Sequence, residues 1–277
     1  MSSRTPRFTI VVPIVGTPEF LALQLRLLRK WCADELDVLI VNDARRVPAP
    51  SNRWIAGTDR QIARMADQLA IRCYRYPQWR HGWLRFRGEA DDPAIRTADV
   101  VQFGFRKALR LYPTQPMVII DSDMFPFAPF SFAEMLADHA IAGIAQHRGQ
   151  VRYLWNGLLI FDAARLPDAT TIDFSCAVIK GELTDVGGML SYYLDHHPEL
   201  AVRYLGHLSS GRWGLAEMPQ SLDGALRSFV VNDPYNGNGT FFSEIYEGCM
   251  FHLRSGGNWQ GDPRFSERIS LFLEAMA

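Results

Sequence analysis

Two aspartates, Asp121 and Asp123, stand two positions apart directly after the apolar run Met117–Ile120. Such a run is typical of a buried strand, and in an extended chain residues two apart point to the same side. Two carboxylates held this close need a cation, and a divalent metal with oxygen ligands would satisfy both and bridge a diphosphate. The pattern therefore indicates metal-assisted chemistry on a diphosphate, with a helix cap or an acid pair in a turn as the structural alternative.

The first forty residues predict a βαβ unit that ends in a second polar pair. The apolar run Phe8–Val12 is followed by an amphipathic stretch of helical period over Glu19–Trp31. A second apolar run, Asp37–Val41, ends in Asn42 and Asp43. We expect a right-handed crossover and a parallel pair of strands. Parallel sheets bind ligands beyond the carboxyl ends of such strands.

The rest of the chain alternates helical and strand patterns. Periodicity fails between Pro77 and Pro93, where arginines interleave with aromatic residues, so a long loop is expected there. That composition would suit single-stranded nucleic acid, but nothing else in the chain is basic, which favours a flap over an anionic ligand or a packing loop. We expect helices over Trp54–Leu69, Thr97–Tyr112 and Gly187–His196, and strands over Ala70–Tyr74, Met117–Ile120 and Tyr153–Phe161.

Composition and charge narrow the class of protein. The chain has 277 residues, 48% of them hydrophobic, which is enough for one large core. Lysine and arginine total 29 against 30 acidic residues, so no overall field attracts nucleic acid or an anionic membrane. No apolar run approaches the roughly 20 residues that span a bilayer, and the N-terminus lacks a signal-peptide pattern. We expect a cytoplasmic protein with no transmembrane segment, no nucleic-acid partner and reduced cysteines.

Three motifs resemble the A-type glycosyltransferase superfamily in their order and spacing: IVVP at Ile10–Pro13, VLIVND at Val38–Asp43 and VIIDSD at Val118–Asp123. The resemblance implies the GT-A fold, a Rossmann-like α/β/α sandwich with a mixed, mostly parallel central sheet. It implies one catalytic domain over residues 1–277, with a nucleotide-binding half at 1–123 and an acceptor-binding half at 124–277. The implied activity is transfer of a hexose from a nucleotide sugar, most commonly a UDP-sugar, to an acceptor saccharide or another small molecule.

The resemblance also assigns residues to the nucleotide. In the superfamily, the first strand and its loop line the base, the acid after the second strand contacts base or ribose, and the D-x-D group binds ribose and metal. Many relatives place a basic residue on the preceding helix, which implies Arg106 or Lys107, with a surface cation as the alternative. The implied nucleotide-binding residues are Pro13, Ile14, Val15, Asp43, Lys107, Asp121 and Ser122.

A C-terminal histidine serves as a further metal ligand in many A-type enzymes. His252 matches that placement in MFHLRSGGNW, where it follows an apolar strand and precedes a glycine turn. The implied metal ligands are therefore Asp121, Asp123 and His252. A mixed carboxylate and imidazole set suits Mn²⁺ better than Mg²⁺, although both remain open. A buried structural histidine is the alternative.

The strand WNGLLIFD at Trp155–Asp162 resembles the one that follows the metal site, where relatives place an Asn or Gly pair beside the donor sugar. This implies Asn156 and Gly157, because glycine admits a sugar close to the backbone and asparagine offers both a donor and an acceptor. The string MFHLRSGGNW adds Arg254, Asn258 and Trp259 as contacts to diphosphate or sugar.

In TDVGG, Asp185 resembles the acceptor-side acid of the superfamily and precedes Gly187 and Gly188. As the candidate catalytic residue, this carboxylate would deprotonate an acceptor hydroxyl, while the glycine turn would shape the sugar pocket. The alternative is that Asp185 is the N-cap of the helix that begins near Met189.

The match is to a superfamily and departs from its subgroups. The QxxRW string of inverting relatives is absent, and HxxGxxKPW of retaining relatives is only echoed by HLRSGGNW, so the stereochemical outcome stays open. VIIDSDMF also resembles the nucleophile motif of haloacid-dehalogenase phosphatases, although that motif usually opens its fold. A third alternative is a non-catalytic protein that binds carbohydrate or nucleotide. The presence of both aspartates and His252 favours an active enzyme.

Overall fold

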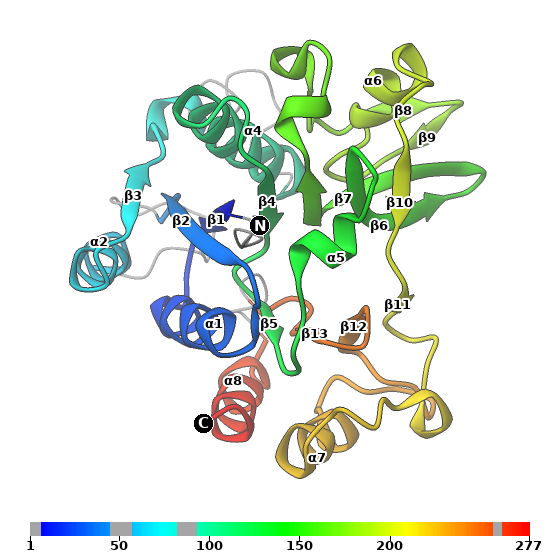
Figure 1. The fold of residues 1–277 in the computed structure, drawn as a ribbon. Coiled ribbons are helices and arrows are strands. Elements are labelled where there is room, and N and C mark those ends of the chain that lie inside the picture. Colours follow the sequence, from blue (N-terminus) through cyan, green and yellow to red (C-terminus); the bar gives the residue numbers. More distant parts are fainter. Residues whose placement is uncertain (1–6, 45–56, 82–92, 257–261) are drawn as a thin grey trace, which may run out of the picture.

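The computed structural model describes residues 7–44, 57–81, 93–256 and 262–277. Its first half contains the predicted βαβ unit and the strand that leads to Asp121 (Figure 1). In chain order the elements of this half are β1 (Arg7–Ile14), α1 (Pro18–Trp31), β2 (Glu35–Asn42), α2 (Thr58–Gln68), β3 (Arg72–Arg75), α4 (Pro93–Leu111) and β4 (Met117–Ile120).

The second half has shorter elements. Its helices are α5 (Phe132–Leu136), α6 (Leu190–His196), α7 (Gly224–Asn232) and α8 (Phe265–Ala275). Its strands are β5 (Met124–Pro126), β6 (Ile141–Arg148), β7 (Val151–Phe161), β8 (Val178–Ile179), β9 (Glu182–Leu183), β10 (Val202–Tyr204), β11 (His207–Leu208), β12 (Glu244–Tyr246) and β13 (Met250–His252). Within the described ranges, no helix is both long and apolar enough to cross a bilayer.

In the described part of the chain, seven strands form the central sheet in the order β10-β6-β7-β4-β1-β2-β3. β1 lies between β4 and β2 and is parallel to both, as are β2 with β3 and β10 with β6. Only β7 runs against its neighbours, β4 and β6. The expected mixed, mostly parallel sheet is therefore confirmed, and the carboxyl ends of β1, β2 and β4 meet at one edge.

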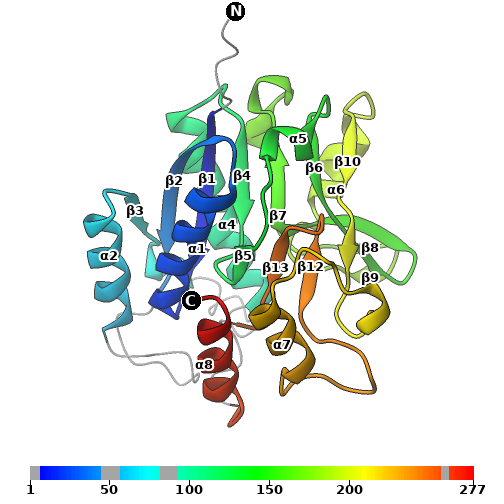
Figure 2. The same ribbon diagram turned by 60° about the horizontal axis from the view of Figure 1, so that its bottom comes forward.

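Helices cover both faces of the sheet, which gives three layers (Figure 2). Alternate side chains of β1 point to opposite faces: Ile10 and Val12 pack in one buried cluster with α1, and Val11 packs in another with α4. At Gly104 of α4, a Cβ atom would come within 2.6 Å of a Val11 methyl carbon, so the absence of a side chain lets this helix approach the sheet. Burial on both faces explains why these strands are continuously apolar.

A smaller antiparallel sheet, β11-β12-β13-β5, is joined to the central one through the Asp121–Asp123 loop. A third buried cluster packs this sheet against α7, α8 and α1, with Phe125, Phe251 and Phe272 at its centre. β13 pairs with β5 so that His252 lies opposite Met124. The small sheet therefore brings the end of β13 to the loop that carries the two aspartates.

The structure corrects the predicted elements in a few places. The helix expected from Gly187 begins at Leu190, because the preceding residues form a turn in which Gly187 has a positive φ of 95°. Residues 78–81 are helical, although they belong to the expected loop Pro77–Pro93; residues 82–92 of that loop lie outside the described ranges. Strand β6 was not predicted, and the short strands of the small sheet carry too few residues to show a period.

Candidate functional site

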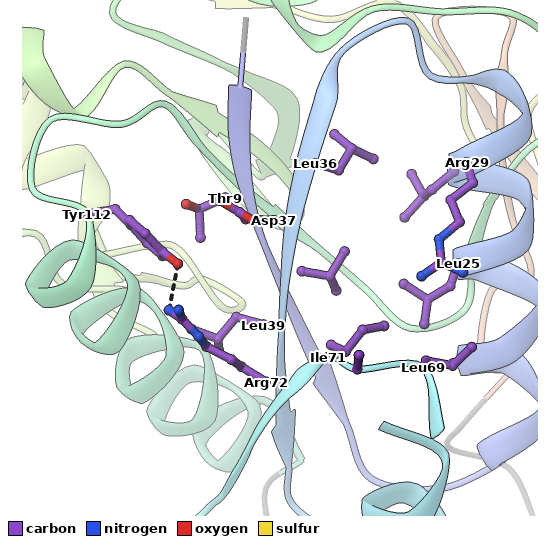
Figure 3. Close-up of a pocket in the computed structure, with 13 residues that line it drawn as sticks. Thr9, Leu25, Arg29, Leu36, Asp37, Leu39, Leu69, Ile71, Arg72 and Tyr112 are labelled. Carbon is purple, nitrogen blue, oxygen red and sulfur yellow. Dashed lines mark hydrogen bonds between the residues drawn. The ribbon is translucent and has the colours of Figure 1, made fainter. Parts of the chain in front are cut away.

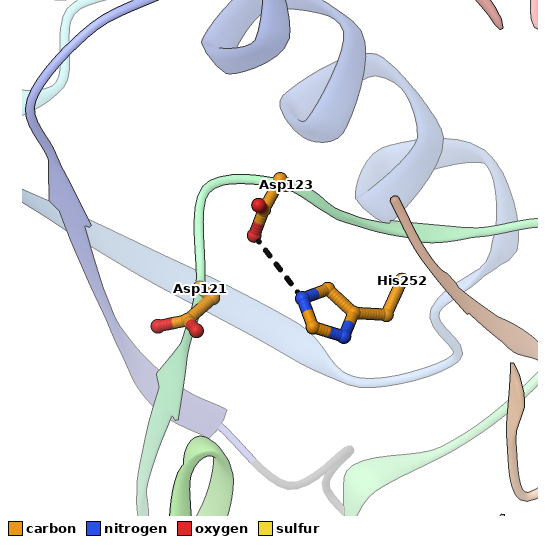
Figure 4. Close-up of side chains that lie close together, drawn as sticks. All are labelled: Asp121, Asp123 and His252. Carbon is orange, nitrogen blue, oxygen red and sulfur yellow. Dashed lines mark ion pairs between the residues drawn. The ribbon is translucent and has the colours of Figure 1, made fainter. Parts of the chain in front are cut away.

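Asp121, Asp123 and His252 form a compact group at the carboxyl edge of the central sheet. One potential ligand atom from each lies within 4.8 Å of the others. Figure 4 shows the three side chains converging, with the imidazole facing the Asp123 carboxylate at 3.5 Å from Nε2 to Oδ1. Two carboxylates and one imidazole are a donor set that fits Mn²⁺ or Mg²⁺. The structure thus brings together the three ligands that the sequence predicts.

Backbone contacts fix the loop between the two aspartates. The side-chain amide of Gln24, buried on α1, donates to the carbonyl oxygens of Asp121 and Met124 at 2.7 Å each. The N–H of Asp121 donates to the Gly157 carbonyl, and the N–H of Leu253 donates to the Asp123 carbonyl, both at 2.9 Å. Sequence analysis did not find Gln24, because an amide on a helix face gives no signal of its distant partner.

Glu244 orients His252, and sequence analysis missed it as well. Its Oε2 accepts a hydrogen bond from Nδ1 of His252 at 2.8 Å and one from the Tyr246 hydroxyl at 2.6 Å. Because a carboxylate only accepts, Nδ1 carries the proton and Nε2 faces Asp123. A carboxylate behind a histidine in this way fixes the ring and raises its basicity, as is usual for metal-binding histidines. Glu244 stands in a strand of three residues, Glu244–Tyr246, which is too short to be recognised from the sequence.

The electrostatics of the group favour a cation. Burial and the neighbouring Asp123 raise the pKa of Asp121 to about 7. Burial lowers the pKa of His252, but Asp123 and Glu244 outweigh it and raise that pKa to about 10. Burial likewise opposes ionisation of Glu244, yet the hydrogen bond from His252 holds its pKa at about 2. Asp121 and His252 therefore hold their protons more tightly than usual, and a divalent ion bound to them would replace those protons.

The group lies in a cavity of about 460 Å³. A cavity of this size is within the range that holds a small-molecule ligand. Of the residues predicted to bind donor or acceptor, those that line the cavity are Pro13, Ile14, Val15, Asp43, Asp121, Ser122, Asp123, Asn156, Asp185, His252 and Arg254. The carboxyl ends of β1, β2 and β4 therefore meet the middle of β7 and the end of β13 around one space.

Asn156 is the clearest sign of a missing polar ligand. Its side chain is 1% exposed and lines the cavity, yet neither its amide nitrogen nor its amide oxygen has a hydrogen-bond partner among the described residues. A buried amide without partners costs about 1–3 kcal/mol, so native proteins rarely leave one unsatisfied. Sugar hydroxyls would supply both the donor and the acceptor that this amide lacks.

Asp43 lies at the end of the cavity formed by β1 and β2, and its carboxylate is already engaged. Oδ1 is 2.6 Å from Nε2 of His81 and accepts a hydrogen bond from the Gln78 amide at 3.1 Å. No local pattern of residues in the sequence predicts this contact between His81 and Asp43. The pair forms because the helical turn at 78–81 folds back over the end of β2.

Asp185 is half-buried at the other end of the cavity. One oxygen accepts a hydrogen bond from the Val186 N–H at 2.8 Å, and the other is 3.6 Å from a guanidinium nitrogen of Arg148. The N-cap of α6 is Met189, so the alternative in which Asp185 caps that helix is wrong. Its carboxylate lines the cavity instead.

Several predicted residues lie elsewhere or serve the local packing. The ammonium group of Lys107 lies 5.4 Å from the ring centres of both Tyr74 and Phe103 and does not line the cavity. At Gly157 a Cβ would come within 2.0 Å of the Trp155 ring, so this glycine makes room for the indole. Added Cβ atoms would also meet the Leu154 carbonyl oxygen at Gly187, 2.2 Å away, and the Thr184 hydroxyl at Gly188, 1.7 Å away. Asn258 and Trp259 lie outside the described residues.

A second cavity, of about 290 Å³, lies at the opposite edge of the sheet (Figure 3). Thr9, Leu36 and Arg72 from the beginnings of β1, β2 and β3 line it, and Arg72 donates to the Tyr112 hydroxyl at 2.5 Å. The candidate metal ligands lie at the other edge. Because ligands of parallel sheets bind at the carboxyl ends of the strands, the first cavity is the candidate site.

No protein-family model and no curated protein sequence matches the chain. Among solved structures, it is similar to the mannosyltransferase PcManGT from Pyrobaculum calidifontis in complex with GDP-Man and Mn²⁺, with 16% identity and a TM-score of 0.37 over 58% of this chain. The match spans 45% of the mannosyltransferase, less than half of its length.

It is also similar to the galactosyltransferase LgtC in complex with donor and acceptor sugar analogues, with 13% identity and a TM-score of 0.42. That match covers 96% of this chain and 95% of the other. Both proteins are glycosyltransferases, the class that the motifs of this sequence resemble. Both likenesses are distant.

Proposed function

We propose that this protein is a metal-dependent glycosyltransferase that moves a hexose from a nucleotide sugar, with a UDP-sugar as the proposed donor, to an acceptor hydroxyl. The observation that carries the proposal is the unsatisfied amide of Asn156 beside the Asp121, Asp123 and His252 group in one cavity. A divalent cation and a polyhydroxylated ligand are the two partners that these side chains lack.

In this proposal the donor spans the cavity. The nucleoside lies against Pro13, Ile14 and Val15 near Asp43, while Asn156 binds hydroxyls of the sugar. Asp121, Asp123 and His252 would hold Mn²⁺, or Mg²⁺ in its place. When bound, the ion neutralises the charge that develops on the departing nucleoside diphosphate. Glu244 accepts the hydrogen bond from Nδ1 of His252 and would leave Nε2 available to the ion.

Asp185 is the proposed catalytic residue on the acceptor side. Its carboxylate faces the cavity and is held by the Val186 N–H and by Arg148. In this place it would orient the attacking hydroxyl and accept its proton as the bond to the sugar forms. The ion pair with Arg148 restricts the direction of the carboxylate.

The experiment that tests the proposal is hydrolysis of nucleotide sugars in the absence of acceptor, with and without Mn²⁺. A panel of UDP-, GDP- and dTDP-sugars covers the donor bases, and Asp123→Ala is the variant. We expect hydrolysis of one donor type that requires the metal and that Asp123→Ala abolishes. Full activity of Asp123→Ala would refute the metal site.

The same samples separate the alternatives. Ligand binding raises the melting temperature by mass action, so each nucleotide is also tested by thermal shift with and without Mn²⁺. A metal-dependent shift without turnover would indicate a binding protein. Release of inorganic phosphate from a phosphomonoester, with no effect of any nucleotide, would indicate the phosphatase.

A further inference from the structure

A smaller hollow lies beside the candidate donor cavity and shares Glu244 with it. It encloses about 180 Å³ between the β6–β7 hairpin and the strands β11 and β12. The two spaces are adjacent, because both are lined by Trp155, Arg148, Arg254, Glu244 and Gln146. A molecule in this hollow would therefore lie next to whatever occupies the donor cavity.

The lining of the hollow is strongly basic, although the whole chain has a net charge of −1. Arg148, Arg212 and Arg254 contribute guanidinium groups, and His147 and His207 contribute imidazoles. We call these five residues the basic groove. Guanidinium groups stay charged at any ordinary pH and match carboxylate and phosphate groups in shape.

The acids nearby leave part of this charge unpaired. A guanidinium nitrogen of Arg148 is 3.6 Å from a carboxylate oxygen of Asp185. The Glu244 carboxylate accepts hydrogen bonds from His252, Tyr246 and the Ser210 N–H. Arg254 donates to the Ser210 hydroxyl at 2.8 Å, and no acidic side chain of the described residues pairs with Arg254 or Arg212. Two cations therefore face the hollow with no acidic partner in the described part of the chain.

An aromatic surface stands between the two spaces. The ring centre of Trp155 lies 5.2 Å from that of His252 and 6.0 Å from that of Tyr246. Trp155 lines both the donor cavity and the hollow beside it. An indole of this kind packs against the apolar face of a sugar ring. The basic groove thus combines a sugar-stacking wall with groups that bind an anion.

We propose that the basic groove binds the acceptor, and that this acceptor is a sugar carrying a carboxylate or phosphate group. The inference rests on the proposed function and narrows its substrate class. The donor diphosphate does not account for the basic groove, because Arg212, His147 and His207 line the hollow and not the donor cavity. The proposed metal ligands Asp121, Asp123 and His252 already face the donor cavity. The anion would contact Arg212 and Arg254 while the ring lies against Trp155.

The test measures binding of simple sugars to the metal-free protein in EDTA, so that no ion at the aspartates can attract an acid. D-glucose, D-glucuronic acid and D-glucose 6-phosphate are titrated and followed by ligand-observed NMR. The variant is Arg212→Gln. The matched control is Arg60→Gln, because Arg60 is an exposed arginine on α2 that lines neither the donor cavity nor the hollow. Circular dichroism confirms that each variant is folded.

We expect the acidic sugars to bind about tenfold or more tightly than glucose, since hydrogen bonds between charged groups are the strong ones. Arg212→Gln should remove most of that preference and Arg60→Gln should not. The acid that binds more tightly identifies the anion as carboxylate or phosphate. Equal binding of glucose and both acids, no binding of either acid, or wild-type affinity in Arg212→Gln would overturn the inference.

Failure of the proposed function would look different. Wild-type protein would then show no metal-dependent hydrolysis of any nucleotide sugar, whatever the result of the sugar titrations. Because the titrations contain neither donor nor metal, their outcome is independent of turnover.

Discussion

The substitution Glu244→Gln tests how the site holds His252. Both oxygens of the Glu244 carboxylate accept hydrogen bonds. Oε2 accepts from His252 Nδ1 and the Tyr246 hydroxyl, and Oε1 accepts from the Ser210 N–H at 3.1 Å. Glutamine keeps the shape but has only one oxygen. Whichever way its amide turns, the NH₂ group faces a donor that the carboxylate had satisfied.

The size of the effect follows from these contacts. One unsatisfied buried donor costs about 1–3 kcal/mol, and loss of the carboxylate behind a ligating histidine typically weakens metal binding roughly ten- to a hundredfold. A tenfold loss of metal affinity corresponds to about 1.4 kcal/mol, which is of the same size as the cost of one unsatisfied donor. Removing the charge also lowers the pKa of His252, which reduces competition by protons. A divalent ion gains more than a single proton from the same negative charge, so the net change is weaker metal binding.

Titration with Mn²⁺ by calorimetry at pH 8 measures the effect directly. The matched control is Glu267→Gln, an exposed acid on α8. We expect an Mn²⁺ dissociation constant about tenfold or more higher in Glu244→Gln than in wild type, and no change in the control. An Mn²⁺ affinity within twofold of wild type, in a folded Glu244→Gln variant, would mean that Glu244 does not orient a metal ligand.

Three further predictions concern the same cavity. His252→Ala should weaken Mn²⁺ binding, and an unchanged metal requirement for hydrolysis would remove His252 from the site. Affinity for Mn²⁺ should rise with pH through about 7 and on toward about 10, because Asp121 and His252, with pKa values raised to those points, must lose their protons to bind the ion; calorimetry across this range would show a flat profile if neither is a ligand. Asn156→Ala should lower kcat/KM for donor hydrolysis roughly tenfold or more without lowering the melting temperature of the ligand-free protein, since removal of its amide breaks no hydrogen bond with the described residues; a large drop in stability with wild-type kinetics would make Asn156 a structural residue.

Much of the first half of the fold could be predicted because its signals are local. The strands β1, β2 and β4 each contain an apolar run that is buried on both faces, and the Met117–Ile120 run was predicted to the residue. The amphipathic period of α1 is equally local, because one side of this helix packs on the sheet. Parallel strands with their carboxyl ends at one edge then place Asp43 and Asp121 around one space.

The second half could not be predicted in the same way, because its short strands are specified by their partners. β5, β12 and β13 have three residues each, too few to show a period. The predicted contacts of Lys107 and Gly157 depended on where helix α4 and the Trp155 ring lie, and their neighbours in the structure are aromatic rings. Side-chain direction in three dimensions decided both cases.

The sequence by itself determined the apolar runs of the strands β1, β2 and β4 and the two aspartates that follow β4, because these depend on residue type and on spacing of a few positions. Only the tertiary structure decided that β13 pairs with β5, which places His252 beside Asp123. It alone decided that Glu244 lies behind the imidazole and that Asn156 is buried without a partner. Contacts between residues far apart in the chain are fixed by packing of the whole core, and no local pattern of residues records them.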